Sequence, residues 1–183
     1  SGCLPEHTLA AKELAFEMGA DYLEQDVVAS RDDALLVLHD IHLDRISDVA
    51  EKFPDRHRAD GRFYARDFDL DEIRQLQAWE RMKADGTAVY PGRYPARTGD
   101  FRIHTLAEEF ELIAALNREH GRNVGVYPEI KRPAWHRSEG VDIAPLLLEH
   151  FPRPVLDRSV QGRRTETHSE ARQEGWDLVF GAC

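Results

Sequence analysis

The run Ala20-Asp-Tyr-Leu-Glu-Gln-Asp-Val-Val28, followed by Ala34-Leu-Leu-Val-Leu-His-Asp40, indicates the fold class of this chain. Both runs are short and mostly apolar, and turn-forming residues separate them, so we expect two β-strands. Because strand side chains alternate between faces, Glu24 and Asp26 project to the same side of the first strand. Two neighbouring carboxylates on a half-apolar face repel each other, and this arrangement favours a bound cation.

A lone Glu-x-Asp pattern is more often a solvent-facing pair on an edge strand, because surface acids are far more common than metal ligands. The surroundings of Glu24 and Asp26 favour a site instead. His39 ends the second strand, and Tyr127-Pro-Glu-Ile-Lys131 ends a third strand, expected over residues 123–127. Barrel and open-sheet α/β enzymes build their sites from polar residues at successive strand ends, so these residues together predict an active site.

Helical patterns alternate with the strands. A helix over residues 9–18, with Gly19 as its stop, leads into the first strand, and a helix over residues 105–116 leads into the third. Thr105 and Glu108 have the spacing of a capping box, and Gly121 marks the end of this second helix. This alternation favours a parallel sheet. The first two strands are joined by a tight turn, so they form either an antiparallel hairpin or a barrel crossover without its helix.

The texture of the sequence changes after residue 40. Residues 41–104 are rich in arginine, aspartate and proline, apart from a helical stretch over residues 70–79, and we interpret them as an insertion. A further helix is expected over residues 141–151. Residues 152–183 have little apolar content and stay unassigned, with disorder or a weakly held helix as the expectation.

Composition limits the classes of function. With 183 residues and 42% hydrophobic content, the chain is expected to form one globular domain. The formal charge of −10 argues against nucleic acid or an anionic membrane as the main partner. We expect no membrane span, and the first residues lack the pattern of a signal peptide. Cys3 and Cys183 match neither a disulfide framework nor a metal knuckle.

Several segments resemble the motifs of glycerophosphodiester phosphodiesterases. These are Ser1-Gly-Cys-Leu-Pro-Glu-His-Thr8, Tyr22-Leu-Glu-Gln-Asp26, Leu38-His-Asp40 with Leu43-Asp-Arg45, and Tyr127-Pro-Glu-Ile-Lys131. Within the insertion, Phe53-Pro-Asp-Arg56 and Asp60-Gly-Arg62 are similar to the periplasmic branch. The resemblance covers about residues 1–151. It implies an α/β fold of the (β/α)8 TIM-barrel type, with an insertion after an early strand, and hydrolysis of a glycerophosphodiester to glycerol 3-phosphate and an alcohol.

The resemblance also implies roles for individual residues. The metal ligands would be Glu24, Asp26 and Glu129, which bind one divalent cation, Ca²⁺ or Mg²⁺. Oxygen ligands suit such hard ions. Glu6 would be an additional metal or substrate contact. His39 would share general acid and base catalysis with a second histidine, and Lys131 would neutralise the phosphate.

The other histidines have no comparable setting, and we expect them on the surface, although His7 belongs to the first motif. They are His7, His42, His57, His104, His120, His136, His150 and His168.

The sequence departs from the family pattern at its start. Family members carry His-Arg-Gly-Ala directly before the Ser-Gly with which this sequence opens, so one catalytic histidine, the phosphate-binding arginine and their strand are expected to be absent. Late strands are not recognisable either. We therefore expect residues 1–183 to form a partial barrel without the first and late strands, with little or no turnover. The alternative is a non-catalytic metal- or ligand-binding remnant.

The resemblance to the periplasmic branch implies a periplasmic location, although the export signal is not present in this chain. The expected partner is a small glycerophosphodiester, and the sequence does not indicate an oligomeric state.

Overall fold

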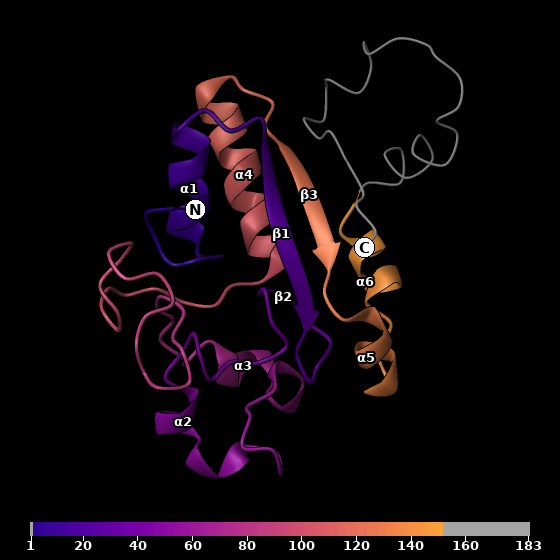
Figure 1. Ribbon diagram of the computed structural model, residues 1–183. Coiled ribbons are helices and arrows are strands. Elements are labelled where there is room, and N and C mark those ends of the chain that lie inside the picture. Colours follow the sequence, from indigo (N-terminus) through magenta and orange to yellow (C-terminus); the bar gives the residue numbers. More distant parts are fainter. Residues whose placement is uncertain (1, 152–183) are drawn as a thin grey trace.

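The computed structural model describes residues 2–151 and shows an α/β arrangement around a small sheet (Figure 1). The strands are β1 (Tyr22–Ala29), β2 (Leu35–Val37) and β3 (Gly125–Ile130), in the spatial order β2-β1-β3. The helices are α1 (Leu9–Glu17), α2 (Val49–Lys52), α3 (Leu70–Ile73), α4 (Leu106–His120), α5 (Pro133–Ser138) and α6 (Ile143–Glu149), with 3₁₀ turns η1 (Pro54–Arg56) and η2 (Ala65–Asp67).

Strand pairing settles the alternatives that the sequence left open. β1 and β3 are parallel, with Asp26 opposite Glu129, so the parallel sheet predicted from the alternation of helices and strands is confirmed. β1 and β2 form an antiparallel hairpin, with Val27 opposite Val37. The hairpin returns the chain toward the middle of β1, where the Leu38 backbone N–H donates to the Asp26 carbonyl at 2.8 Å. The residues directly after β2 are therefore held beside Asp26 of β1.

Two apolar cores lie on opposite faces of β1. Leu23 and Val27 pack into the first core with side chains of α1, α4 and α6, including Phe16 and Ile113. Figure 1 shows α1 and α4 running along the same side of the sheet. Burial of each large apolar side chain contributes about 1.5–3 kcal/mol relative to its exposure, so these contacts fix the helices on β1.

The second core belongs to the 41–104 segment. Val28 of β1 joins it, together with Leu43, Phe68 and Leu76, all of which are fully buried. This core attaches the 41–104 segment to the opposite face of β1, next to the end of the hairpin. The segment therefore has its own packing and is fixed relative to the sheet.

The local signals around α4 are confirmed. The Thr105 side chain accepts from the Glu108 backbone N–H at 3.2 Å, and the Glu108 carboxylate accepts from the Thr105 N–H at 2.7 Å. Gly121 ends the helix in the left-handed conformation, with φ of 60°. The chain then enters β3 within a few residues.

The predicted helix over residues 70–79 is wrong beyond its first turn, because α3 ends at Ile73. Backbone groups farther along bond to distant segments. The Ala78 N–H donates to the Phe101 carbonyl at 2.8 Å, and the Trp79 N–H donates to the Ile46 carbonyl at 2.9 Å. These tertiary bonds replace the helical ones. α5 was not predicted, and its Pro133 occupies the first turn, where a missing N–H is tolerated.

The surface expectation is wrong for two histidines away from the site. His136 is fully buried, and its Nε2 accepts from the Ala29 backbone N–H at 3.2 Å. His104 is also buried, and its Nε2 bonds to Glu109 at 2.8 Å.

Two other expectations concern membrane spans and the last residues of the chain. Within the described residues, no helix has the length and apolar character needed to cross a membrane. The expectation for residues 152–183 lies outside the described residues.

Candidate metal centre and active site

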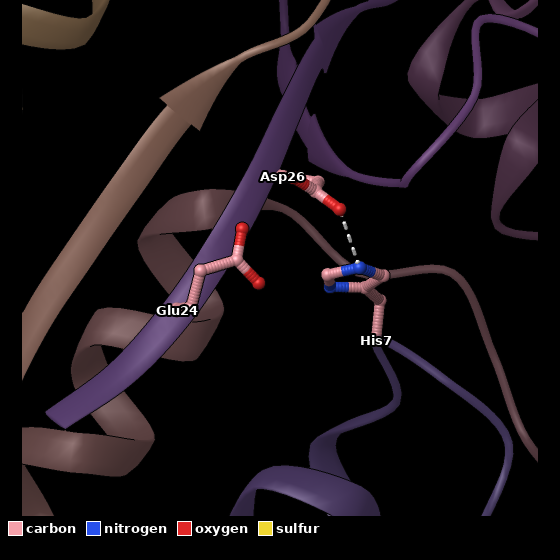
Figure 2. Close-up of side chains that lie close together, drawn as sticks. All are labelled: His7, Glu24 and Asp26. Atoms are coloured by element: carbon pink, nitrogen blue, oxygen red, sulfur yellow. Dashed lines mark hydrogen bonds and ion pairs between the residues drawn. The ribbon is translucent and has the colours of Figure 1, made fainter. Parts of the chain in front are cut away.

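Glu24, Asp26 and His7 converge at one face of β1 (Figure 2). Each offers one ligand atom, and these atoms lie within 4.8 Å of one another. His7 Nε2 lies 2.9 Å from Asp26 Oδ2. Figure 2 shows both carboxylates projecting from the same side of the strand toward the imidazole, which comes from the loop before α1. Strand alternation therefore supplies the carboxylate pair, and the preceding loop supplies the histidine.

The loop that carries His7 is held at both ends. Thr8 caps α1 by accepting from the Ala11 backbone N–H at 3.2 Å, and its hydroxyl donates to the Pro5 carbonyl at 2.9 Å. His7 itself has a φ of 53°, which is uncommon for a non-glycine residue. Such backbone strain persists where the surroundings fix it, here through the bond to Asp26. The expectation that His7 lies on the surface without a special setting is wrong.

Glu129 of β3 and Lys131, which directly follows this strand, both reach the site. Lys131 Nζ lies 2.9 Å from Asp26 Oδ1 and 2.8 Å from Glu129 Oε1, so the ammonium bridges carboxylates of two strands. The parallel register explains the meeting, because Glu129 pairs directly with Asp26. Although partial burial lowers it, bonds to the two carboxylates raise the pKa of Lys131 above its ordinary value. Lys131 is therefore a charged ammonium at neutral pH.

The pKa values of the two β1 carboxylates are shifted in opposite directions. Partial burial, followed by the hydrogen bond and repulsion from Asp26, raises the pKa of Glu24 to about 8. Burial also acts on Asp26, but hydrogen bonds from His7, Glu24 and Lys131 outweigh it and lower its pKa well below the ordinary value. In the absence of a cation, a proton on Glu24 relieves the repulsion between the two carboxylates. This behaviour is typical of like charges that share a site.

The charge balance of the site fits a divalent cation. Glu24, Asp26 and Glu129 supply three carboxylates beside the ammonium of Lys131, and Lys12, which also acts on Glu24, is paired with Glu109. When all three carboxylates are ionised, they exceed the charge of Lys131 by two formal negative charges. Burial is the main cause that lowers the pKa of His7, so its imidazole adds no charge near neutral pH. Carboxylate oxygens are the ligands that hard cations prefer. The residues present therefore suit a hard divalent cation.

His39 and Glu6 lie next to this group but are not part of it. His39 follows β2, is half exposed, and has its Nδ1 3.5 Å from Asp40 Oδ1. Glu6 is bonded elsewhere, because its Oε1 accepts from Arg81 Nε at 2.9 Å. The structure thus brings together Glu24, Asp26, Glu129 and Lys131, adds His7, and places His39 and Glu6 at the edge.

Two residues near the site were missed as candidates. The position of His7 directly before the α1 cap was a usable signal, because a residue there is held by the cap. Arg81 had no comparable signal, since it lies within the irregular 41–104 segment.

Comparison with known proteins identifies the family. The sequence model of the glycerophosphoryl diester phosphodiesterase family matches residues 1–171. The chain belongs to this family. Family members have a TIM-barrel fold and depend on a divalent metal, in agreement with the α/β fold and the carboxylate group described above.

The relatives named glycerophosphodiester phosphodiesterase include bacterial proteins with high similarity to this chain. The one from Haemophilus influenzae is 51% identical over 161 residues, which cover 86% of this chain and 44% of the relative. The one from Treponema pallidum is 48% identical over 151 residues, which cover 81% of this chain and 42% of the relative. The chain thus spans less than half the length of these curated relatives.

Solved structures support the family fold. A phosphodiesterase of Oleispira antarctica, in complex with the product sn-glycerol-3-phosphate, is 25% identical with a TM-score of 0.51, over 84% of this chain and 50% of that chain. A protein of Silicibacter pomeroyi, described as a putative glycerophosphoryl diester phosphodiesterase, is 19% identical with a TM-score of 0.60. That match covers 98% of this chain and 54% of the other, and it bears on the fold alone.

Proposed function

We propose that this protein takes part in the hydrolysis of glycerophosphodiesters to glycerol 3-phosphate and an alcohol, with one divalent cation. One observation carries the proposal. Carboxylates from β1 and β3 meet around Lys131 with two uncompensated negative charges, in a chain that belongs to the glycerophosphodiester phosphodiesterase family. The Oleispira relative, whose structure holds sn-glycerol-3-phosphate, supports the class of product.

Glu24 and Asp26, whose ligand atoms lie in one group with His7, would hold the cation, Ca²⁺ or Mg²⁺, together with Glu129, which pairs with Asp26 in the sheet. When bound, the cation would stabilise the negative charge that develops on the phosphodiester. Lys131 supplies a second positive charge from a fixed position, because bonds to Asp26 and Glu129 hold its ammonium. A preorganised charge of this kind stabilises a transition state without the cost of reorientation. Lys131 would therefore bind and orient the phosphate.

His39 would provide a proton-transfer group. Its imidazole is half exposed at the end of the β1–β2 hairpin, and the preceding residue, Leu38, is bonded to the Asp26 backbone. Histidine is the side chain most often used as a general acid or base, so His39 could protonate a leaving alkoxide. The second histidine of this reaction would come from the His-Arg-Gly-Ala segment of the family pattern.

We also propose that this chain contributes to one domain of the (β/α)8 barrel type, with residues 41–104 as an insertion after an early strand. The parallel β1–β3 pair, the helices along one face and the separate core of the 41–104 segment support this arrangement.

An activity assay tests the function. Glycerophosphocholine would be supplied to residues 1–183 and to an extended version, expressed from the full gene, in which the expected His-Arg-Gly-Ala segment and its strand precede Ser1. Each protein would be assayed with a chelator and then with added Ca²⁺ or Mg²⁺. We expect the extended version to release glycerol 3-phosphate only when the cation is present. Residues 1–183 alone should show little turnover. Absence of chelator-sensitive release from the extended version would overturn the proposal.

Two lysine variants test the role of Lys131 in the same assay. Lys131→Met should lower kcat about 100-fold or more, because it removes a fixed charge beside the phosphate. The control Lys83→Met lies at an exposed position of the 41–104 segment and should leave kcat within about twofold. Cation binding without hydrolysis in both versions of the chain would favour the alternative, a non-catalytic metal-binding protein.

A periplasmic location is also proposed, since the motifs in the 41–104 segment resemble the periplasmic branch. Osmotic-shock fractionation of cells that express the full gene would test it. Recovery of the protein with cytoplasmic markers would contradict it.

A further inference from the structure

Arg81 links two loops that are far apart in the sequence. Its Nε donates to Glu6 Oε1 at 2.9 Å, its Nη2 donates to the same carboxylate, and its Nη1 donates to Asp40 Oδ2. The side chain of Arg81 is only 14% exposed. All three guanidinium nitrogens are therefore engaged, with one partner on each loop.

Each partner of Arg81 adjoins a histidine of the candidate site. Glu6 directly precedes His7, whose Nε2 is bonded to Asp26. Asp40 directly follows His39 and lies 3.5 Å from its imidazole. One guanidinium thus connects the loop that carries His7 with the loop that carries His39.

Arg81 is itself held in place by the 41–104 segment. Its backbone N–H donates to Glu80, and its carbonyl accepts from the Val89 N–H at 2.9 Å. Glu80 is fully buried and bonded to Arg93 Nε at 2.9 Å. The next residue, Met82, donates its N–H to the Arg45 carbonyl at 2.8 Å. The backbone from which the guanidinium reaches the site is therefore held in place.

We propose that Arg81 is a positioning residue that fixes the separation of the His7 and His39 loops, so that the 41–104 segment sets the geometry of the active site. This inference rests on the proposed hydrolysis. Arginine suits the task because its planar fork can bond two carboxylates at once, whereas a lysine ammonium offers a single point of charge. A displacement of about 1 Å at a reacting group can lower the rate about 100-fold.

The competing explanation is that Arg81 only stabilises the fold. Partly exposed ion pairs contribute about 0–1 kcal/mol, so in that case its removal would lower stability slightly and leave kcat unchanged. The two explanations differ in which property changes.

The test compares Arg81→Met and Arg81→Lys with Arg102→Met, in the version of the chain with His-Arg-Gly-Ala before Ser1. Arg102 lies in the same segment and pairs with Asp100 at 2.8 Å, on the exposed surface. We expect Arg81→Met to lower kcat about 10- to 100-fold, with KM and Ca²⁺ affinity by calorimetry changed by less than about threefold. Arg81→Lys should restore the rate in part, and Arg102→Met should match the wild type.

A second readout does not depend on turnover. In the cation-free protein, the imidazole NMR signals of His7 and His39 should both shift in Arg81→Met and stay unchanged in Arg102→Met. If Arg81→Met lowers only the melting temperature and leaves kcat and both imidazole signals unchanged, the inference is overturned. If the wild type shows no chelator-sensitive hydrolysis, the proposed function fails, and a shift of both imidazole signals would then show a linked pair of loops without catalysis.

Discussion

Both faces of β1 carry buried polar groups, but the carboxylates on the two faces differ in how many positively charged partners they have. The back face of β1 is the one that packs against α1 and α4. Here Gln25 and Glu109 are fully buried, and Lys12 is nearly so. Glu109 lies 3.2 Å from Lys12 Nζ and 2.8 Å from His104 Nε2, and it accepts from Gln25 Nε2 at 3.0 Å. The Glu109 carboxylate is therefore matched by one ammonium and two further bonds.

The front face of β1 is the one from which Glu24 and Asp26 project. Its carboxylates outnumber their positively charged partners. Lys131 is shared between Asp26 and Glu129, and the pKa of Glu24 is raised to about 8, mainly by partial burial and then by Asp26. The comparison teaches that residue type alone does not separate a structural carboxylate from a ligand. The supply of positive charge within the chain separates them, and a deficit indicates a cation site.

The largest expected effect is on the back face. Glu109→Ala leaves the Lys12 ammonium buried without its carboxylate, and breaking a buried pair in this way costs about 3–5 kcal/mol. Glu111→Ala, at an exposed position of the same helix, should change stability by less than about 0.5 kcal/mol. Urea unfolding, monitored by circular dichroism, measures the stability of both variants. Equal effects of the two variants would contradict the structural role of the back face.

The front face should respond in affinity instead of stability. Glu24→Gln removes a repelling carboxylate, so the melting temperature of the cation-free protein should stay the same or rise. The same change removes a ligand oxygen and should weaken Ca²⁺ binding at least about tenfold. Calorimetric titration measures the affinity, and Glu13→Gln on the exposed side of α1 serves as the control. Unchanged affinity in Glu24→Gln would remove the distinction between the two faces.

The smallest effect concerns acid. Burial raises the pKa of Glu109, but the hydrogen bond from His104 and the charge of Lys12 outweigh burial and hold it below the ordinary value. A lowered folded-state pKa means that the carboxylate stabilises the fold above the unfolded pKa of about 4.5. That contribution is lost as pH falls toward the folded-state pKa.

The wild type should therefore lose more stability than Glu109→Gln when the pH is lowered from about 6 to about 3. Urea unfolding at a series of pH values measures the difference. Parallel pH curves for the two proteins would show that Glu109 is not linked to folding in this way.

Much of the fold followed from short stretches of sequence. The alternation in β1 placed Glu24 and Asp26 on one face, and the Thr105 cap and Gly121 marked the ends of α4. The helix expected over residues 70–79 failed because Ala78 bonds to a backbone group far along the chain. Local propensity is a weak signal where distant segments compete for the same backbone groups.

The sequence by itself determined the carboxylate pair, the helix caps and the family, because each of these signals lies within a few neighbouring residues. Only the tertiary structure decided which charges have partners. His7 and Asp26 are 19 positions apart, and Arg81 and Glu6 are 75 positions apart. Interactions over such separations depend on how the strands and the 41–104 segment pack, so the charge deficit on the front of β1 became visible only in the folded chain.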